Sequence, residues 1–210
     1  MGVRSDQRGA PSPPGLSSLF SLEDQLSFYV AYHSDRVNKA IHVVFIPTIA
    51  WTVLVLCAQL GPGVEVRAEG WGLSAPALAA VEFVGASRRV NLSHALLALY
   101  ALYYLRLDPV AGSLAAPILA VMTATANATP MAPTSVLALH VAAWVAQFVG
   151  HGVFEKKRPA LVDSLFQAFL IAPFFALLEV LFALGYRQDL ALRVDARAAG
   201  AGASSAKKRG

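Results

Sequence analysis

The sequence predicts an all-α fold, a polytopic membrane bundle of about four to six embedded helices. Hydrophobic residues make up 56% of the 210 positions and charged residues only 14%, against about a quarter in ordinary soluble domains. The stretch 109–154 contains no Asp, Glu, Lys or Arg. A chain this small lacks the surface to cover such a stretch in a soluble core, and the alternating pattern of barrel strands is absent.

Six apolar blocks supply the predicted membrane helices, at residues 41–60, 73–85, 90–105, 110–126, 134–150 and 164–185. Three of them approach the roughly 20 residues that a helix needs to cross a hydrocarbon core. Helix breakers separate several blocks, at 61–63, 108–109 and 128–133. The last block either crosses fully or bends at Pro173 into a hairpin, which would keep the basic clusters on both sides of it on one membrane face.

Ahead of the first block, residues 22–32 predict an amphipathic helix. The polar stretch 34–39 follows, in which Ser34 or Asp35 is a typical helix N-cap, so we expect a turn there and a membrane helix that opens near Ile41. Residues 1–18 predict a disordered tail and residues 191–210 a basic flexible tail, because neither composition buries enough apolar surface. The domain is therefore expected at 19–190.

The charge and cysteine content exclude several classes of protein. Cys57 is the one cysteine, so an intramolecular disulfide and a thiolate metal cluster are both excluded. The net charge is +4, but the basic residues lie at the ends and in connectors without interleaved aromatics, which argues against nucleic-acid binding.

Four histidines point to chemistry within the apolar sequence, where an imidazole is costly unless it is paired or ligated. His140 and His151 are eleven residues apart, so on one helix they share a face with Gln147. His33 and His42 converge only if the chain bends between them. Since imidazole suits iron, zinc, copper and nickel, these two pairs favour a metal site.

Two other embedded polar residues have plainer interpretations. His94 is predicted to be a hydrogen-bonded packing residue, because its neighbours are apolar. Glu179 lies in the last apolar block, where it serves either as a relay or ligand, or as an interhelical hydrogen-bond partner.

Two groups of motifs resemble the yeast 2-hydroxy fatty acid dioxygenase family, and the resemblance extends from about residue 20 to 186. The opening motif comprises Leu22-Glu23-Asp24-Gln25, Tyr29-Val30-Ala31-Tyr32-His33, Asn38, Ile41-His42 and Pro47. The closing motif comprises His140, Trp144, Gln147-Phe148, Gly150-His151, Phe154-Glu155, Arg158-Pro159-Ala160-Leu161, Asp163, Leu165, Gln167, Ala172-Pro173 and Glu179.

The resemblance implies a multi-pass protein of the endoplasmic reticulum membrane that uses Fe(II) and dioxygen to shorten a 2-hydroxy fatty acid by one carbon, in the breakdown of phytosphingosine. It implies four iron ligands, His33, His42, His140 and His151, with Asn38, Gln147 and Glu155 as supporting catalytic residues. Four histidines and a bidentate substrate would fill an octahedral ion and leave no position for dioxygen. We therefore expect that one histidine is a support or leaves when substrate binds, or that dioxygen reacts without prior coordination; a two-histidine, one-carboxylate set would recruit Asp35 or Glu155.

Other functions remain open from the sequence. One is a non-enzymatic membrane carrier or scaffold whose histidines pair helices, and another is a bis-histidine haem protein. The terminal Lys207-Lys208-Arg209-Gly210 resembles a dilysine retrieval signal of the endoplasmic reticulum, and a basic solvated tail explains it equally well.

Overall fold

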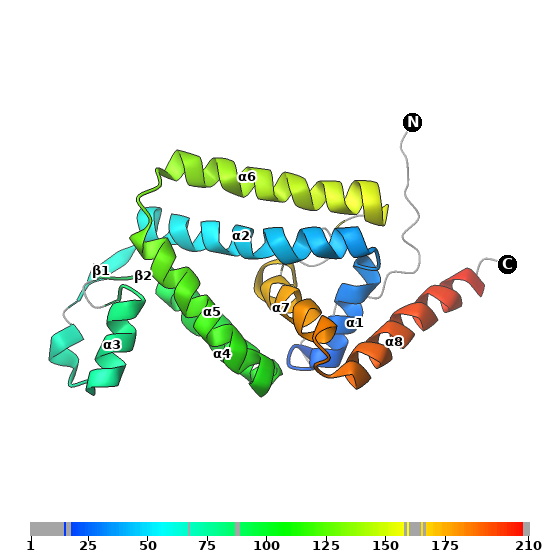
Figure 1. The fold of residues 1–210 in the computed structure, drawn as a ribbon, viewed down its shortest axis with the longest axis horizontal. Coiled ribbons are helices and arrows are strands. Elements are labelled where there is room, and N and C mark those ends of the chain that lie inside the picture. Colours follow the sequence, from blue (N-terminus) through cyan, green and yellow to red (C-terminus); the bar gives the residue numbers. More distant parts are fainter. Residues whose placement is uncertain are drawn as a thin grey trace. The chain divides into compact units, whose positions relative to one another are not determined.

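The computed structural model describes residues 15, 18–66, 68–86, 89–157, 159, 165 and 167–207. It confirms the predicted all-α class (Figure 1). Among the described residues, the strands are the short antiparallel pair β1 (Gly63–Glu65) and β2 (Arg89–Asn91), in which Val64 lies opposite Val90. This pair closes the connection that contains the 3-10 turn η2 (Ala68–Trp71) and α3 (Ala75–Phe83).

Three helices in the described part of the chain are long and apolar enough to cross a membrane. They are α2 (Arg36–Leu60), α5 (Pro109–Ala128) and the continuous helix Pro133–Glu155, which consists of α6 (Pro133–Val149) and the π-helical segment η3 (Gly150–Glu155). A bent pair, Phe169–Ala183 with Gln188–Ala198, makes a fourth candidate. The blocks predicted at 73–85 and 90–105 form helices too short for this, α3 and α4 (Leu92–Leu107).

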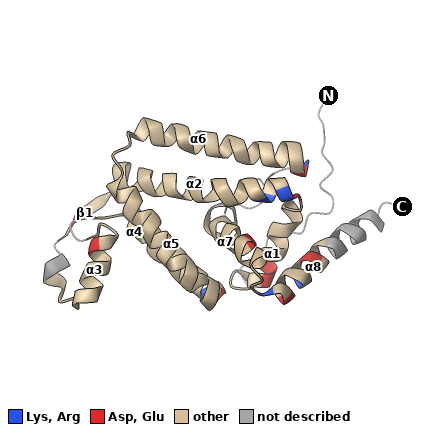
Figure 2. Ribbon diagram, in the orientation of Figure 1, with Lys and Arg blue, Asp and Glu red and all other residues tan. Residues whose placement is uncertain are grey.

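The exposed residues of these helices fit a lipid environment. In Figure 2 the ribbons of α5 and α6 are uncoloured by charge along their length, because neither helix contains Asp, Glu, Lys or Arg. The exposed apolar residues recur every three or four positions and so form a stripe along each helix: Val110, Leu114, Ile118 and Val121 on α5, and Leu137, Val141, Val145 and Phe148 on α6. In water such stripes would be a liability, whereas hydrocarbon tails cover them at no cost.

By its contacts the chain divides into two compact units. One contains residues 1–40 and 150–210, and the other is Ile41–Val149. Helix α2 and the helix Pro133–Glu155 each run from one unit into the other.

In the first unit, α1 (Leu22–Tyr32) packs against α7 (Ala172–Ala183) and α8 (Gln188–Lys207). The π-helical turn η5 (Gln167–Ile171) leads into α7. Pro173 lies in the first turn of α7, where a proline costs no hydrogen bond, and the bend of 116° follows α7 instead, before Gln188. The predicted bend at Pro173 is therefore displaced to the end of that helix.

The segment predicted as a C-terminal tail forms most of α8. Leu190 and Val194 are buried, and Arg193 and Arg197 form ion pairs with the acidic first turn of α1. Local composition disfavoured this helix, and the contacts with α1 compensate for it. Residues 1–14, 16, 17 and 208–210, which hold most of the predicted N-terminal tail and the end of the dilysine motif, lie outside the described residues.

In the second unit, α2 and α6 run antiparallel. The side chain of Gln59 donates to the carbonyl of Met131 at 2.9 Å, and Thr52 is hydrogen-bonded to His140 at 2.8 Å. The segment just before α6 thus lies beside the end of α2, and the middle of α6 lies beside an earlier turn of α2. A core of Leu54, Val55, Ala126 and Val136 lies between these contacts.

Helix α4 packs along α5, and polar residues join the two. The Asn91 side chain donates to Asn127 Oδ1 at 2.7 Å, and Asn127 donates to Ser93 Oγ at 3.0 Å. His94 accepts from the backbone N–H of Asn91 at Nδ1 and donates to the carbonyl of Val84 from Nε2. The predicted packing role of His94 is thus confirmed: it completes the capping box of α4.

Candidate metal centre

His33 is the C-cap residue of α1, and a hydrogen bond determines the tautomer of its imidazole ring. Its Nδ1 lies 2.8 Å from the backbone carbonyl oxygen of Tyr29, one turn earlier. A carbonyl only accepts, so Nδ1 carries the proton and the lone pair of the neutral ring is on Nε2. A backbone contact of this kind orients the ring of a histidine ligand in metalloproteins.

The side chain of Tyr29 supports the same imidazole. The two rings are stacked, with centroids 4.0 Å apart and an interplanar angle of 15°. Burial, followed by the charges of Glu179 and Glu155, raises the pKa of the Tyr29 phenol well above its ordinary value. The ring that packs on His33 is therefore uncharged at neutral pH.

His151 lies beside His33, although 118 positions separate them in the sequence. Their ring centroids are 4.9 Å apart in an edge-on arrangement. His151 belongs to η3, where the helix Pro133–Glu155 widens into a π-helical turn. Such turns occur often at functional sites, because they redirect side chains at the cost of regular hydrogen bonds.

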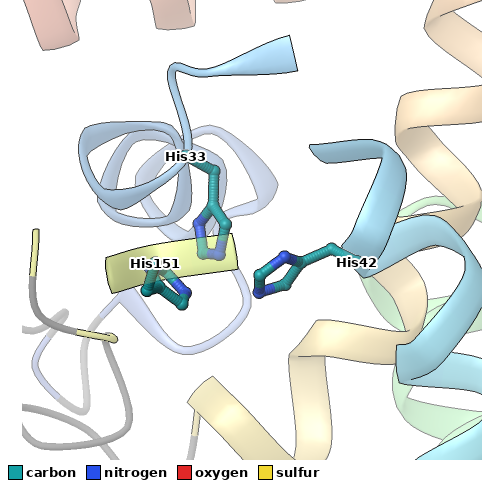
Figure 3. Close-up of side chains that lie close together, drawn as sticks. All are labelled: His33, His42 and His151. Carbon is teal, nitrogen blue, oxygen red and sulfur yellow. The ribbon is translucent and has the colours of Figure 1, made fainter. Parts of the chain in front are cut away.

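His42 completes a group of three histidines (Figure 3). His42 lies in the second turn of α2, whereas His33 is the C-cap of α1 and His151 belongs to η3. One ring nitrogen from each residue lies within 4.8 Å of the others, and all three residues are at most 4% exposed.

The donor set of this group fits a transition-metal ion. Nitrogens bound at about 2 Å from one ion lie up to about 4 Å apart, a separation that small ring rotations reach from the observed one. Three buried imidazoles without a thiolate suit iron, zinc, copper or nickel, and three protein ligands leave positions for other molecules. The histidine group can therefore hold a metal ion that also binds a substrate.

The structure does not bring His140, the fourth predicted ligand, into this group. Trp144 donates to its Nε2 at 3.0 Å, so its Nδ1 carries the proton and donates to Thr52 Oγ1 at 2.8 Å. Thr52 in turn donates to the carbonyl of Ile49. Both nitrogens of His140 are thus used within the second unit, and no lone pair is left for a metal ion.

Helix geometry explains the position of His140. It shares a helix face with His151, but eleven residues rise by roughly 16 Å along the axis. One ion cannot bind both rings across that distance. In the antiparallel pairing, His140 lies at the level of Thr52, ten residues beyond His42 in α2.

Glu155 is buried and accepts hydrogen bonds from several groups at the start of α2. The backbone N–H groups of Ser34 and Asp35 donate at 2.9–3.1 Å, and the Ser34 hydroxyl donates at 2.6 Å. Asn38 Nδ2 donates at 3.2 Å and Lys157 Nζ at 3.0 Å. The Glu155 carboxylate thus binds the N-terminal end of α2, although Asp35 lies 120 positions earlier in the sequence. Both carboxylate oxygens accept hydrogen bonds.

The other polar residues predicted near the site also have structural partners. Asp35 accepts from the backbone N–H groups of Val37 and Asn38, which confirms it as the N-cap of α2 and moves the start of that helix five residues before the predicted Ile41. Glu179 forms an ion pair with Lys39 at 2.9 Å. Of its two interpretations, the structure shows the contact between helices.

Gln147 lies one helical turn before His151 and is 3% exposed. Neither Oε1 nor Nε2 of its side chain has a hydrogen-bond partner in the described part of the chain. The sequence did not predict the roles of Tyr29, Ser34 and Lys157. Only for Tyr29 was there a local signal, its position one turn before His33 on the same helix.

The chain is similar in sequence to known proteins over most of its length. A family model described as 2-hydroxy-palmitic acid dioxygenase Mpo1-like matches residues 19–184. The protein named 2-hydroxy-palmitic acid dioxygenase MPO1 from Saccharomyces cerevisiae is 31% identical over 174 residues, which cover 82% of this chain and 86% of that protein.

No solved structure matches the chain. Of the residues in the closing motif, Arg158, Ala160, Leu161 and Asp163 lie outside the described residues, whereas all the histidines are described. The match covers both motifs and both units, and we conclude that the chain belongs to the Mpo1-like family.

Proposed function

We propose that this protein is an Fe(II)-dependent dioxygenase that shortens 2-hydroxy fatty acids by one carbon. The observation that carries the proposal is the convergence of His33, His42 and His151 in a member of this family. The name of the yeast relative supplies the substrate class.

The reaction needs no electron donor besides the substrate. A 2-hydroxy acid and one dioxygen molecule give the acid shortened by one carbon, carbon dioxide and water. Conversion of C2 to a carboxyl group releases three electrons and conversion of C1 to carbon dioxide releases one, and these four electrons reduce dioxygen. Bound Fe(II) would supply the centre at which the carboxylate and hydroxyl of the substrate and dioxygen meet.

The protein contributes orientation and exclusion of water. Tyr29 holds the His33 ring through its carbonyl and its stacked side chain. Glu155 ties the turn after His33 to the segment that carries His151. We assign His140 to the support of α2 and α6, which agrees with the expectation that one histidine of the four is not a ligand. Asn38 acts through Glu155.

The membrane explains how such a substrate reaches a protein of this size. A long acyl chain partitions into the bilayer, and α5 and α6 present apolar stripes to lipid. We propose that the protein is a multi-pass protein of the endoplasmic reticulum membrane, as its resemblance to the yeast family implies.

Turnover by purified protein tests this function. In detergent, wild-type protein loaded anaerobically with Fe(II) should convert a 2-hydroxy C16 acid to the C15 acid and carbon dioxide with uptake of one dioxygen. His151→Ala should abolish conversion. His94→Gln is the matched control, because a glutamine amide can replace both hydrogen bonds of the His94 ring, the one from the Asn91 N–H and the one to the Val84 carbonyl. Absence of conversion by iron-loaded wild-type protein contradicts the proposal, and a Soret band would favour the haem alternative.

A further inference from the structure

The carboxamide of Gln147 has no structural role that the described residues reveal. It is 3% exposed, and neither its donor nor its acceptor has a partner among them. A buried polar group left without a hydrogen bond destabilises the folded protein. Gln59, on α2, differs in that its Nε2 donates to the carbonyl of Met131, so only its Oε1 lacks a partner among the described residues. An amide that destabilises the protein on its own is expected where a ligand provides the missing partners.

The position of Gln147 places this amide next to the proposed metal centre. It precedes His151 by four residues on the helix Pro133–Glu155, so the two lie on one face. Side chains of a helix lean toward its N-terminus, and the His151 ring therefore extends back toward the turn that carries Gln147. A molecule bound at His151 and extending along this face toward the helix N-terminus therefore passes within about one helical turn of the amide.

The chemistry of a carboxamide matches the head of a 2-hydroxy acid. The acid presents an acceptor, its carboxylate, and a donor, its hydroxyl, on adjacent carbons. The amide presents a donor and an acceptor on a single carbon. Being neutral, it recognises the carboxylate without forming an ion pair strong enough to draw it from a metal ion.

We propose that Gln147 selects 2-hydroxy acids over unsubstituted fatty acids, with Nε2 donating to the carboxylate and Oε1 accepting from the 2-hydroxyl group. This inference rests on the proposed function and adds the residue that sets its substrate class. A fatty acid without the hydroxyl leaves Oε1 buried and unpaired, which is the kind of mismatch by which polar sites reject analogues most strongly.

Stability distinguishes this role from a structural one. In the absence of substrate, Gln147→Leu removes two unpaired polar groups at similar volume, so its midpoint of thermal unfolding should equal or exceed that of the wild type. Gln147→Met retains the length of the side chain and serves as a second variant if leucine does not fit. Gln59→Leu is the control, because it removes a hydrogen bond that the structure shows and should lower the midpoint.

Binding measurements on the iron-loaded protein test the selection itself. The probes are a 2-hydroxy C16 acid, with its KM and kcat, and the unsubstituted C16 acid as a competitive inhibitor. Wild-type protein should bind the 2-hydroxy acid more tightly than the unsubstituted acid. In Gln147→Leu and in Gln147→Met, the ratio of the two affinities should fall by about tenfold or more, which corresponds to one lost hydrogen bond. Iron content should not change.

The outcomes separate this inference from the function on which it rests. Conversion by wild type with an unchanged preference in both Gln147 variants overturns the role of Gln147 and leaves the dioxygenase assignment in place. Unfolding of both variants shows a structural role and also overturns it. Failure of iron-loaded wild-type protein to bind or convert any 2-hydroxy acid refutes the proposed function itself.

Discussion

Glu155 holds Ser34, 121 positions earlier in the chain, through three hydrogen bonds. Its oxygens accept from the Ser34 backbone N–H at 3.0 and 3.1 Å and from the hydroxyl at 2.6 Å. Ser34 directly follows His33, and Glu155 lies four residues after His151. This contact therefore fixes the spacing of two histidines that belong to distant parts of the sequence.

Removal of the Glu155 charge should loosen both the fold and the metal centre. In Glu155→Gln, the new NH2 group faces N–H donors, so we expect a loss of about 1–3 kcal/mol of stability. Metal affinity should fall about 10–100-fold, as it does when residues that orient ligands are changed. Thermal unfolding and metal titration measure the two effects. Glu82→Gln, at an exposed position on α3, is the control, and equal behaviour of the two variants would contradict the role of Glu155.

His140 and His151 should respond differently to substitution. His140→Phe removes both hydrogen bonds to Thr52 and Trp144 and should destabilise the protein by about 1–3 kcal/mol while metal stoichiometry stays unchanged. His151→Ala should lose the metal. If His140→Phe also lost the metal in a folded sample, His140 would return to the ligand set.

The sequence singled out the three histidines that the structure brings together, but it did not show how they are arranged. Apolar length and the charge-free stretch were enough for the helical class, because the bilayer allows few alternatives. The spacing of eleven residues predicts that His140 and His151 share a helix face, but the rise along the helix separates the two rings. Periodicity predicts the helix face on which a residue lies. Only the antiparallel pairing of α2 with α6 shows which residue along that face lies near His42.

Contacts between distant segments could not be predicted from one sequence. Glu155 was identified as a support, but nothing local indicates that its partners are Ser34 and Asp35. Likewise, residues 191–207 have the composition of a tail, and they form α8 because α1 offers them an apolar surface and opposite charges. Helix propensity is a weak predictor of secondary structure wherever tertiary contacts determine whether a helix forms.

Gly112 should be essential for the packing of α4 on α5. A Cβ atom at this position would lie 2.5 Å from the backbone nitrogen of Leu105, so Gly112→Val forces the helices apart and should destabilise the protein by about 1–3 kcal/mol or more. Gly70→Val, where nothing lies within 4 Å, is the control. Thermal unfolding midpoints in detergent compare them, and a midpoint for Gly112→Val as high as that of Gly70→Val would contradict the close packing.

The ion pairs between α8 and α1 should give a small stabilisation that depends on salt. Arg193 and Arg197 contact Glu23 and Asp24, and half of each arginine side chain is exposed. The double variant Arg193→Gln, Arg197→Gln should unfold at a slightly lower temperature than the wild type at low ionic strength, and the difference should shrink in 1 M salt because exposed charges are screened. A large difference that persists in high salt would show that these residues act through packing.

The most direct test of the metal centre is the iron content of single histidine variants. Protein purified without oxygen and loaded with Fe(II) should retain about one iron per chain in the wild type, His94→Gln and His140→Phe, since three imidazoles form one site. His33→Ala, His42→Ala and His151→Ala should each lose it while remaining helical by circular dichroism. Retention of a full equivalent of iron by all three alanine variants would contradict the account.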